Sequence, residues 1–218
     1  LPMRSTFLKS TLLQSILVSL ILLLLSSPGW SQKKQYESLQ EALYSARQLR
    51  GEGGPSNLVW INDGDQYSFS KRSEGNQEIW IHDMKSGEER QVFTTGEVTF
   101  PDSDDPFSYA SYQWAGGDNY LLFQCNFNPV WRYSGNADYY YYSLETGTLE
   151  KIVEQAFTAE VSPDGTKVGF GKDGNLFAYH FETRETIQYT DDAKPHFYNG
   201  RFGWAYEEEF GLVQAWSW

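Results

Sequence analysis

The stretch "YYYYSLETGTLEKIV", residues 139–153, contains an aromatic run, a polar turn and a second, shorter apolar run. "IWIHDMKSGEERQVF" from Ile79 and "LFAYHFETRETIQYT" from Leu176 have the same layout, and their equivalent positions are 60 and 37 residues apart. Each segment predicts a strand, a tight turn and a second strand. The turns are Lys85–Gly87, Glu145–Gly147 and Glu182–Arg184.

A further hairpin is predicted upstream of each segment, around an Asp/Gly pair. These hairpins are "VWINDGDQYSF" at Val59, "YQWAGGDNYLLF" at Tyr112 and "AEVSPDGTKVGF" at Ala159. Four-stranded units that repeat every ~40 to 50 residues are typical of β-propeller blades. A β-sandwich, the competing architecture, does not explain the recurring layout. We therefore predict an all-β fold, a partial β-propeller of about three four-stranded blades plus the start of another.

Composition limits the partners that the chain can bind. Aromatic residues make up 17% of the chain and there are 19 glycines, which suits short strands joined by tight turns. The net charge of −12 and the dispersal of the 17 Lys and Arg residues argue against a nucleic-acid partner. The single cysteine, Cys125, excludes a disulfide within the chain and a thiolate cluster for zinc, and is expected to be a buried thiol.

The first 31 residues are typical of an export signal. Met3 is followed by the basic residues Arg4 and Lys9, by an apolar run over 16–25, and by small residues that are spaced for cleavage after residue 31. The alternative is an uncleaved membrane anchor, but the apolar run is short of the ~20 residues that span a bilayer. We therefore predict a signal peptide over 1–31 and a periplasmic or extracellular location.

The remainder of the chain divides into two predicted parts. Residues 32–56 are an N-terminal helix and linker: residues 36–50 place leucines and alanines on one helical face, and "GEGGPS" then ends the helix. Residues 57–218 form the incomplete propeller. About three blades do not close a ring of four to eight. Because the chain also stops within "AWSW" and starts before Met3, we expect a fragment at both ends.

Motifs for catalysis are missing from the sequence. No G-x-S-x-G nucleophile turn follows the signal segment, and no H-E-x-x-H metal motif occurs. His82, His180 and His196 are isolated from one another in the sequence and are expected to be packing or surface residues. We therefore predict no metal, no cofactor and no catalytic residue in this chain.

"YEEEFG", residues 206–211, is the acidic run that could carry a function. Tyr206, Phe210 and Val213 lie at i, i+4 and i+7, which predicts a short helix. On a helix Glu208 and Glu209 project about 100° apart, so that both carboxylates could converge on one ammonium group. The residues alone leave two interpretations open: a solvated acidic face, which is the commoner case, and a two-carboxylate clamp.

The order of "WRYS", "SPDG", "NGRFGWAYEEEFG" and "AWSW" resembles the N-terminal propeller of the dipeptidyl peptidase IV subfamily, in the prolyl oligopeptidase family of serine peptidases. The resemblance runs from about residue 57 to 218. It implies that Glu208 and Glu209 bind the free α-amino group of a substrate and that Arg132 contacts a substrate carbonyl or carboxylate, leaving Glu207 a structural role. Phe210 follows the third glutamate directly where some members insert a residue, which leaves the acid pair intact.

The resemblance implies the substrate-recognition part of an exported serine exopeptidase that releases dipeptides from N-termini, with Pro or Ala as the second residue. The Ser-Asp-His triad would lie in a C-terminal α/β-hydrolase domain absent from this chain, which is expected to be inactive alone. The implied partners are peptides with a free N-terminus and that hydrolase domain, with a homodimer left open. The alternatives are a non-catalytic propeller that binds proteins or peptides, and a relative that trims other N-terminal peptides.

Overall fold

The structure is a computed structural model that describes residues 35–45 and 55–218. The chain divides into two units, Leu1–Glu52 and Gly53–Trp218, and each is described by itself. The predicted signal peptide, residues 1–31, lies outside the described residues. Within the described ranges, no helix is long and apolar enough to cross a lipid bilayer.

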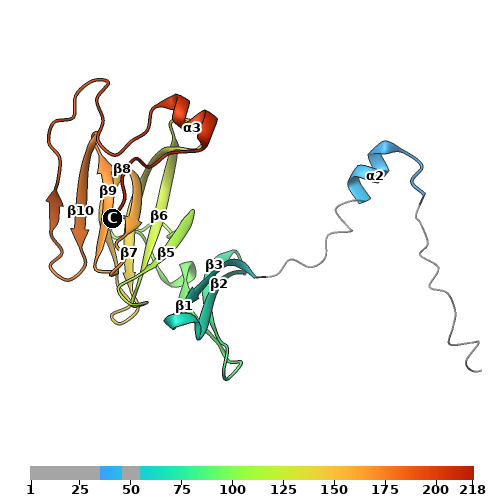
Figure 1. Cartoon of the computed structure of the whole chain (residues 1–218). Helices are drawn as coiled ribbons and strands as arrows, with labels where there is room; N and C mark the ends of the chain where they lie inside the picture. The colour runs from blue at the N-terminus through green and yellow to red at the C-terminus, as the bar shows by residue number, and fades with distance from the viewer. Residues whose placement is uncertain (1–34, 46–54) are drawn as a thin grey trace, which may run out of the picture. The chain divides into compact units, whose positions relative to one another are not determined.

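The first unit contains helix α2 (Leu39–Ser45), which lies inside the predicted range of 36–50 (Figure 1). The helix begins at Leu39 because the Ser38 hydroxyl accepts a hydrogen bond from the backbone N–H of Glu41, at 3.1 Å. A serine that precedes a helix and satisfies the third N–H is a helix-starting pattern. Residues 46–50 of the predicted helix lie outside the described residues.

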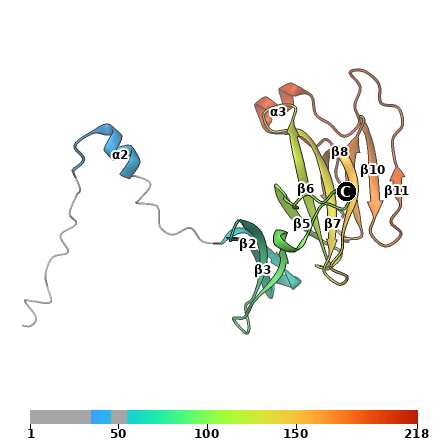
Figure 2. The ribbon, with the colours of Figure 1, turned by 180° about the vertical axis from the view of Figure 1, so that it is seen from behind.

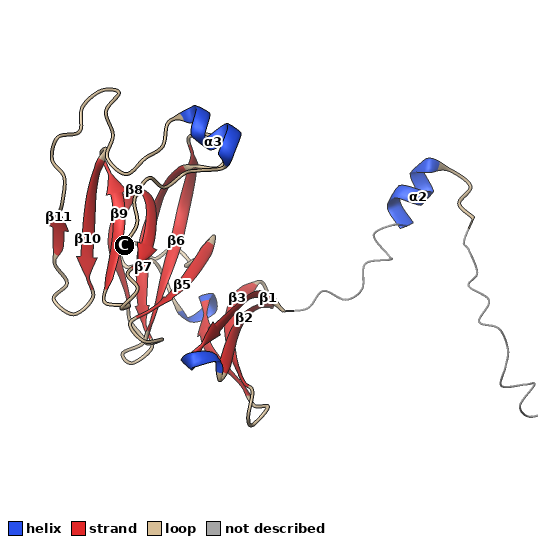
Figure 3. Ribbon diagram, in the orientation of Figure 1, coloured by secondary structure: helices blue, strands red, loops and turns tan. Residues whose placement is uncertain are grey.

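The second unit opens with a four-stranded antiparallel sheet in which consecutive strands are neighbours, as predicted for a first blade (Figure 3). Its strands are β1 (Ser56–Ile61), β2 (Gln66–Ser73), β3 (Asn76–Asp83) and β4 (Glu89–Thr94), with the 3-10 helices η2 (Asn62–Gly64) and η3 (Thr95–Glu97) after β1 and β4.

The remaining strands form a seven-stranded antiparallel sheet in sequential order, followed by helix α3 (Trp204–Phe210). Residues 149–157 of β8 pair with β7, whereas residues 157–161 pair with β9, so that one long strand joins two predicted blades. No glycine or proline interrupts β8. The strand instead bends at bulges, where Gln155 and Thr158 have positive φ angles of 51° and 50°. The strands are β5 (Ser111–Ala115), β6 (Tyr120–Pro129), β7 (Gly135–Ser143), β8 (Leu149–Val161), β9 (Lys167–Lys172), β10 (Asn175–His180) and β11 (Thr186–Gln188).

The three turns that defined the repeat have the same structure. In each, the backbone N–H of the third turn residue donates to the carbonyl oxygen four residues earlier, at 2.9 Å. That third residue has a positive φ: 74° at Gly87, 67° at Gly147 and 58° at Arg184. Arginine thus occupies a position that glycine holds twice, although left-handed backbone favours glycine. The shared hydrogen bond confirms that the three segments are structurally equivalent.

The other three hairpins meet at one end of the unit, as blades arranged around an axis require. Their turns, at residues 60–64, 114–118 and 161–165, line one open depression of about 570 Å³. Asn62 N–H donates to Asp118 Oδ2 at 2.7 Å, and Gly116 N–H donates to the carbonyl of Gly165 at 2.8 Å. The fold is therefore a partial β-propeller, in which the hairpin turns that open successive blades lie side by side.

The aromatic run of β7 packs both faces of the seven-stranded sheet. Tyr139 and Tyr141 lie in one cluster with Phe170 of β9, while Tyr140 lies in the other cluster, with Phe93 of the first sheet. This alternation follows from the period of two along a strand. Cys125 of β6 is fully buried in the second cluster, as predicted. The core thus consists of apolar layers on the faces of the blades, which is the packing expected of a propeller.

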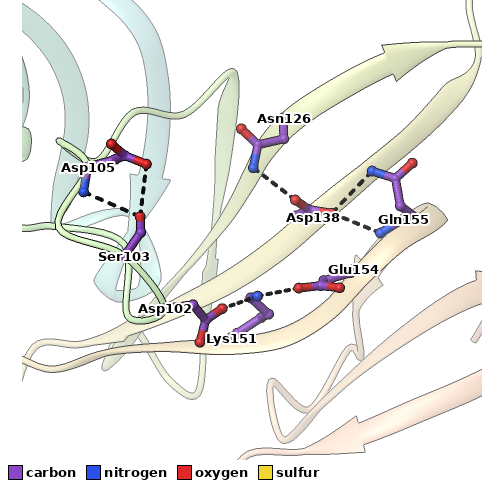
Figure 4. A network of polar contacts seen from close by, with 8 residues as sticks. All are labelled: Asp102, Ser103, Asp105, Asn126, Asp138, Lys151, Glu154 and Gln155. Atoms are coloured by element: carbon purple, nitrogen blue, oxygen red, sulfur yellow. Dashed lines mark hydrogen bonds and ion pairs between the residues drawn. The ribbon is translucent and has the colours of Figure 1, made fainter.

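Asp138 of β7 holds the ends of β6, β7 and β8 in register (Figure 4). Its Oδ2 accepts from Asn126 Nδ2 at 2.8 Å, and its Oδ1 accepts from the backbone N–H of Gln155 at 2.9 Å. Asn126 and Gln155 both lie at bulges and both have positive φ angles. Nearby, Lys151 of β8 pairs with Asp102, in the connection between the two sheets. The Asp138 carboxylate therefore accepts hydrogen bonds from bulged residues of two strands, β6 and β8, close to the β6–β7 connection.

Candidate functional site

A tight turn between β6 and β7, residues 130–134, carries Arg132. The Ser134 carbonyl accepts hydrogen bonds from the backbone N–H groups of Val130 and Trp131, at 2.9 and 3.0 Å, which closes the turn. Gly135 allows the strands to approach, because a Cβ there would lie 2.3 Å from the Asn128 carbonyl oxygen. The Arg132 side chain is 66% exposed, so its guanidinium is presented to solvent at the tip.

Helix α3 lies next to this turn, at the end of β6 in both views (Figures 1 and 2). The predicted helix is confirmed, but it ends at Phe210 and so does not include Val213. Gly211 ends it in the left-handed conformation, with φ of 66°, and its N–H donates to the Glu207 carbonyl at 2.9 Å. Gly211, the last residue of "YEEEFG", marks this end of the helix in the sequence. The apolar spacing alone, which extended the prediction to Val213, did not take it into account.

Glu207 fastens α3 to the β6–β7 turn. Its side chain is 1% exposed. Oε1 accepts from the backbone N–H groups of Tyr133 and Ser134, at 2.7 and 3.0 Å, and Oε2 accepts from Ser134 Oγ at 2.6 Å. Three donors on one carboxylate are a strong arrangement, because hydrogen bonds to a charged acceptor are stronger than neutral ones. The first glutamate of the run is thus structural.

Burial of Glu207 raises the pKa of its carboxyl, but the surrounding donors outweigh that effect. The Ser134 hydroxyl, the two backbone N–H groups and the charge of Arg201 all favour the ionised form, and together they hold the pKa below its usual range. Glu207 is therefore a buried carboxylate at neutral pH.

The structure brings Arg132 and Glu208 together. Arg132 Nε lies 3.1 Å from Glu208 Oε2, and the Glu208 side chain is only 17% exposed. Glu209 follows on the same helix, is exposed, and forms no ion pair or hydrogen bond with the described part of the chain. The two predicted acids therefore differ: Glu208 is half enclosed and paired, and Glu209 is free.

This arrangement suits recognition of a group that carries both a cation and an acceptor. The carboxylates of Glu208 and Glu209 can accept the donors of an ammonium group, and the guanidinium of Arg132 can donate to a carbonyl or carboxylate. Within residues 35–45 and 55–218, no cluster of three or more His, Cys, Asp or Glu side chains could hold a metal ion.

The sequence did not reveal the role of Arg201, whose charge acts on Glu207. Its aromatic neighbour Trp131 lies far away in the sequence.

Comparison with known proteins points to one family. The family described as "Dipeptidyl peptidase IV (DPP IV) N-terminal region" matches residues 116–218, which include the β6–β7 turn and α3. Over these residues the chain is similar to the dipeptidyl peptidase IV N-terminal region. That region, within the prolyl oligopeptidase family, is what the motifs of Arg132 and Glu207–Glu209 had predicted.

Curated relatives and a solved structure are named as dipeptidyl aminopeptidases or dipeptidyl peptidases. "Dipeptidyl aminopeptidase B" of Saccharomyces cerevisiae is 30% identical over 90 residues, 41% of this chain and 11% of that protein. "Probable dipeptidyl-aminopeptidase B" of Tuber melanosporum is 28% identical over 169 residues, 70% of this chain and 18% of that protein. The crystal structure of Porphyromonas gingivalis dipeptidyl peptidase 4 superposes with a TM-score of 0.64 at 22% identity, over 83% of this chain and 26% of that one.

The likeness to dipeptidyl peptidases thus covers the fold as well as the motifs. The structural match extends the likeness beyond residues 116–218 and supports the partial propeller. The chain spans between 11% and 18% of the length of the two curated relatives.

Proposed function

We propose that this chain is the N-terminal substrate-recognition propeller of an exported serine exopeptidase that releases dipeptides, X-Pro or X-Ala, from peptide N-termini. The observation that carries the proposal is the ion pair between Arg132 and Glu208, with the free carboxylate of Glu209 beside it on α3. In a solvated acidic face, the glutamates would contact only water. Here Glu208 pairs with Arg132 from a separate turn, and the buried Glu207 fastens that turn to the helix.

The chemistry of a peptide N-terminus fits these three side chains. An α-amino group with a pKa of about 7.7 to 8.0 is largely protonated at neutral pH and has three donors. Two fixed carboxylates, Glu208 and Glu209, match that ammonium and keep it charged. Arg132, whose planar fork donates to carbonyl or carboxylate oxygens, orients the first residues of the peptide.

Such a clamp sets the position of cleavage. When the α-amino group is held, a fixed length of peptide extends toward the nucleophile, so that the second peptide bond is placed for attack. A chain that continues beyond the amine binds less well, because it brings no ammonium group to Glu208 and Glu209 and its extra residues would have to pass the two carboxylates. The Ser-Asp-His chemistry belongs, in this proposal, to an α/β-hydrolase domain that follows the propeller.

The domain boundaries form part of the same proposal. Residues 1–31 are a signal peptide, residues 32–56 are a helix and linker, and residues 57–218 are the propeller portion. The basic residues, apolar run and small residues of 1–31 are the basis for proposing export.

Kinetics of the full-length protein test the proposal. Glu208→Gln and Glu209→Gln are each expected to lower kcat/KM on dipeptide amides with a free amine about 30- to 1,000-fold. This corresponds to about 2 to 4 kcal/mol, the scale for removing one partner of a charge pair that becomes buried when the peptide binds. Glu182→Gln, on the exposed turn between β10 and β11, is the matched control and should leave kcat/KM unchanged. Wild-type kcat/KM in both α3 variants would rule out the clamp.

A further inference from the structure

Arg201, in the segment before α3, lies in a box of aromatic rings. The guanidinium carbon lies 4.3 Å from the ring centre of Trp131 and 4.5 Å from that of Phe157, with the Tyr198 ring at 5.8 Å. Guanidinium groups stack favourably on aromatic faces. The rings come from the β6–β7 turn, from β8 and from the segment before α3, so the cation is held from three separate elements.

The donors of Arg201 have no acceptor. Within residues 35–45 and 55–218, its guanidinium donates no hydrogen bond and forms no ion pair, and its Nε is a buried atom without a partner. Aromatic contacts satisfy the charge but not the N–H groups, which point along the plane of the guanidinium. Buried donors without acceptors are rare in proteins and each costs free energy.

Arg201 lines a cavity of about 210 Å³. Lys172, at the end of β9, is a second cation that lines it and that forms no ion pair in the described part of the chain. In an acidic protein with net charge −12, two unpaired cations at one cavity are unexpected. The other polar lining residues are Asn136, Gln155 and Asn199, which have amide side chains, and Asp173, which is exposed in the β9–β10 turn.

We propose that this cavity binds a carboxylate group, held by the guanidinium fork of Arg201 and by the ammonium group of Lys172. Because Trp131 and Phe157 contact Arg201, the guanidinium is fixed with its donors free, which suits the two parallel oxygens of a carboxylate. The Asn136 amide can supply a further donor, whereas the Gln155 amide already donates to Asp138 and the Asn199 amide to Asn175 and Asp192. Arg201 and Lys172 outnumber Asp173 by two charges to one, so the cavity favours an anion.

The carboxylate can come from two sources. One is an acidic side chain of a bound peptide, because Arg201 connects the cavity to the clamp. Its guanidinium stacks on Trp131, directly before Arg132, and its charge acts on Glu207, directly before Glu208. The other is a small free dicarboxylate. The proposal concerns residues that the clamp does not use, and therefore stands or fails independently of the proposed function.

Binding to the intact protein tests the proposal. Succinate is titrated while the Nε–Hε signal of Arg201 is followed by ¹H–¹⁵N NMR, with chloride and inorganic phosphate as comparison anions. A second arm compares free-amine peptides whose first residue is Glu or Gln, each with its N-acetylated form. A shift of the Arg201 signal by succinate, or tighter binding of the Glu peptide than of its Gln counterpart, supports the carboxylate site and identifies its source.

Variants of Arg201 and Lys172 distinguish the paired hydrogen-bond donors of the guanidinium group from its positive charge. Arg201→Lys keeps the cation but loses the paired donors, and should weaken succinate or Glu-peptide binding about tenfold, as loss of one charge-assisted hydrogen bond predicts. Lys172→Gln should also weaken it, and this variant preserves the test if Arg201→Lys does not fold. Arg184→Lys, whose arginine pairs with Glu150 on another turn, is the control and should bind normally.

Three results would overturn the proposal. The first is a lack of response both to succinate and to the Glu-for-Gln exchange. The second is an equal response to chloride or phosphate, and the third is unchanged binding in both cavity variants. Failure of the clamp has a different signature, because N-acetylated and free-amine peptides would then bind equally.

Discussion

Replacing Glu207 by alanine removes the acceptor that three donors of the β6–β7 turn share. The backbone N–H of Ser134 becomes buried without a partner, the half-buried N–H of Tyr133 loses its acceptor, and the Ser134 hydroxyl is left to rotate. A buried donor left unsatisfied costs about 1 to 3 kcal/mol. Because Tyr133 can turn toward water, we expect Glu207→Ala to lower the free energy of unfolding by about 3 kcal/mol in total.

Glutamine at the same position distinguishes hydrogen bonding from charge. Its amide oxygen can accept from both backbone N–H groups, and the Ser134 hydroxyl can reverse to accept from the amide N–H. Glu207→Gln should therefore cost only about 1 kcal/mol, the difference between charge-assisted and neutral hydrogen bonds. Glu209→Ala on the exposed face of α3 is the matched control, expected within about 0.5 kcal/mol of wild type.

The cost of Glu207→Gln should depend on pH. The pKa of Glu207 in the folded protein lies below the ordinary value of 4.5, so its contribution is fully present above that value and is lost as pH falls through the folded pKa. The gap between wild type and Glu207→Gln should narrow in acid. Urea unfolding and amide exchange at Tyr133 and Ser134 measure these effects; native-like stability and exchange protection in Glu207→Ala would refute the anchoring role.

Two further predictions concern the sheet that supports the site. Asp138→Ala should lower the free energy of unfolding by about 2 kcal/mol, since it removes the acceptor for two bulged residues, whereas the exposed Asp191→Ala should not; equal urea midpoints would contradict this. Burial raises the pKa of the Cys125 thiol to about 12, so iodoacetamide at pH 8 should label the folded protein far more slowly than the urea-unfolded one. Equal labelling rates would show that the thiol is accessible.

Local turn chemistry made the hairpins predictable from the sequence. Gly87 and Gly147 supply left-handed turn positions, and the strands before these turns contain short apolar or aromatic runs. The joining of two blades through β8 was not predictable, because it depends on bulges at Gln155 and Thr158 that have no local signal. The bulge at Gln155 is held by a contact with Asp138, on a different strand.

The site was predictable where residues adjacent in sequence determine it. The helix that carries Glu208 and Glu209 follows from the acidic run and its flanking aromatic residues. The partner of Glu207 could not be derived, because the turn that binds it is brought to α3 only by the fold. The aromatic box of Arg201 is hidden for the same reason: Trp131 and Phe157 lie on separate elements.

The most direct test of the account is calorimetric binding of a dipeptide amide to the protein with its amine free and with its amine acetylated. The account predicts that the free amine binds, that acetylation abolishes binding, and that Glu208→Gln weakens binding of the free form. Equal affinity for the two forms would contradict the claim that α3 and the β6–β7 turn recognise a peptide N-terminus.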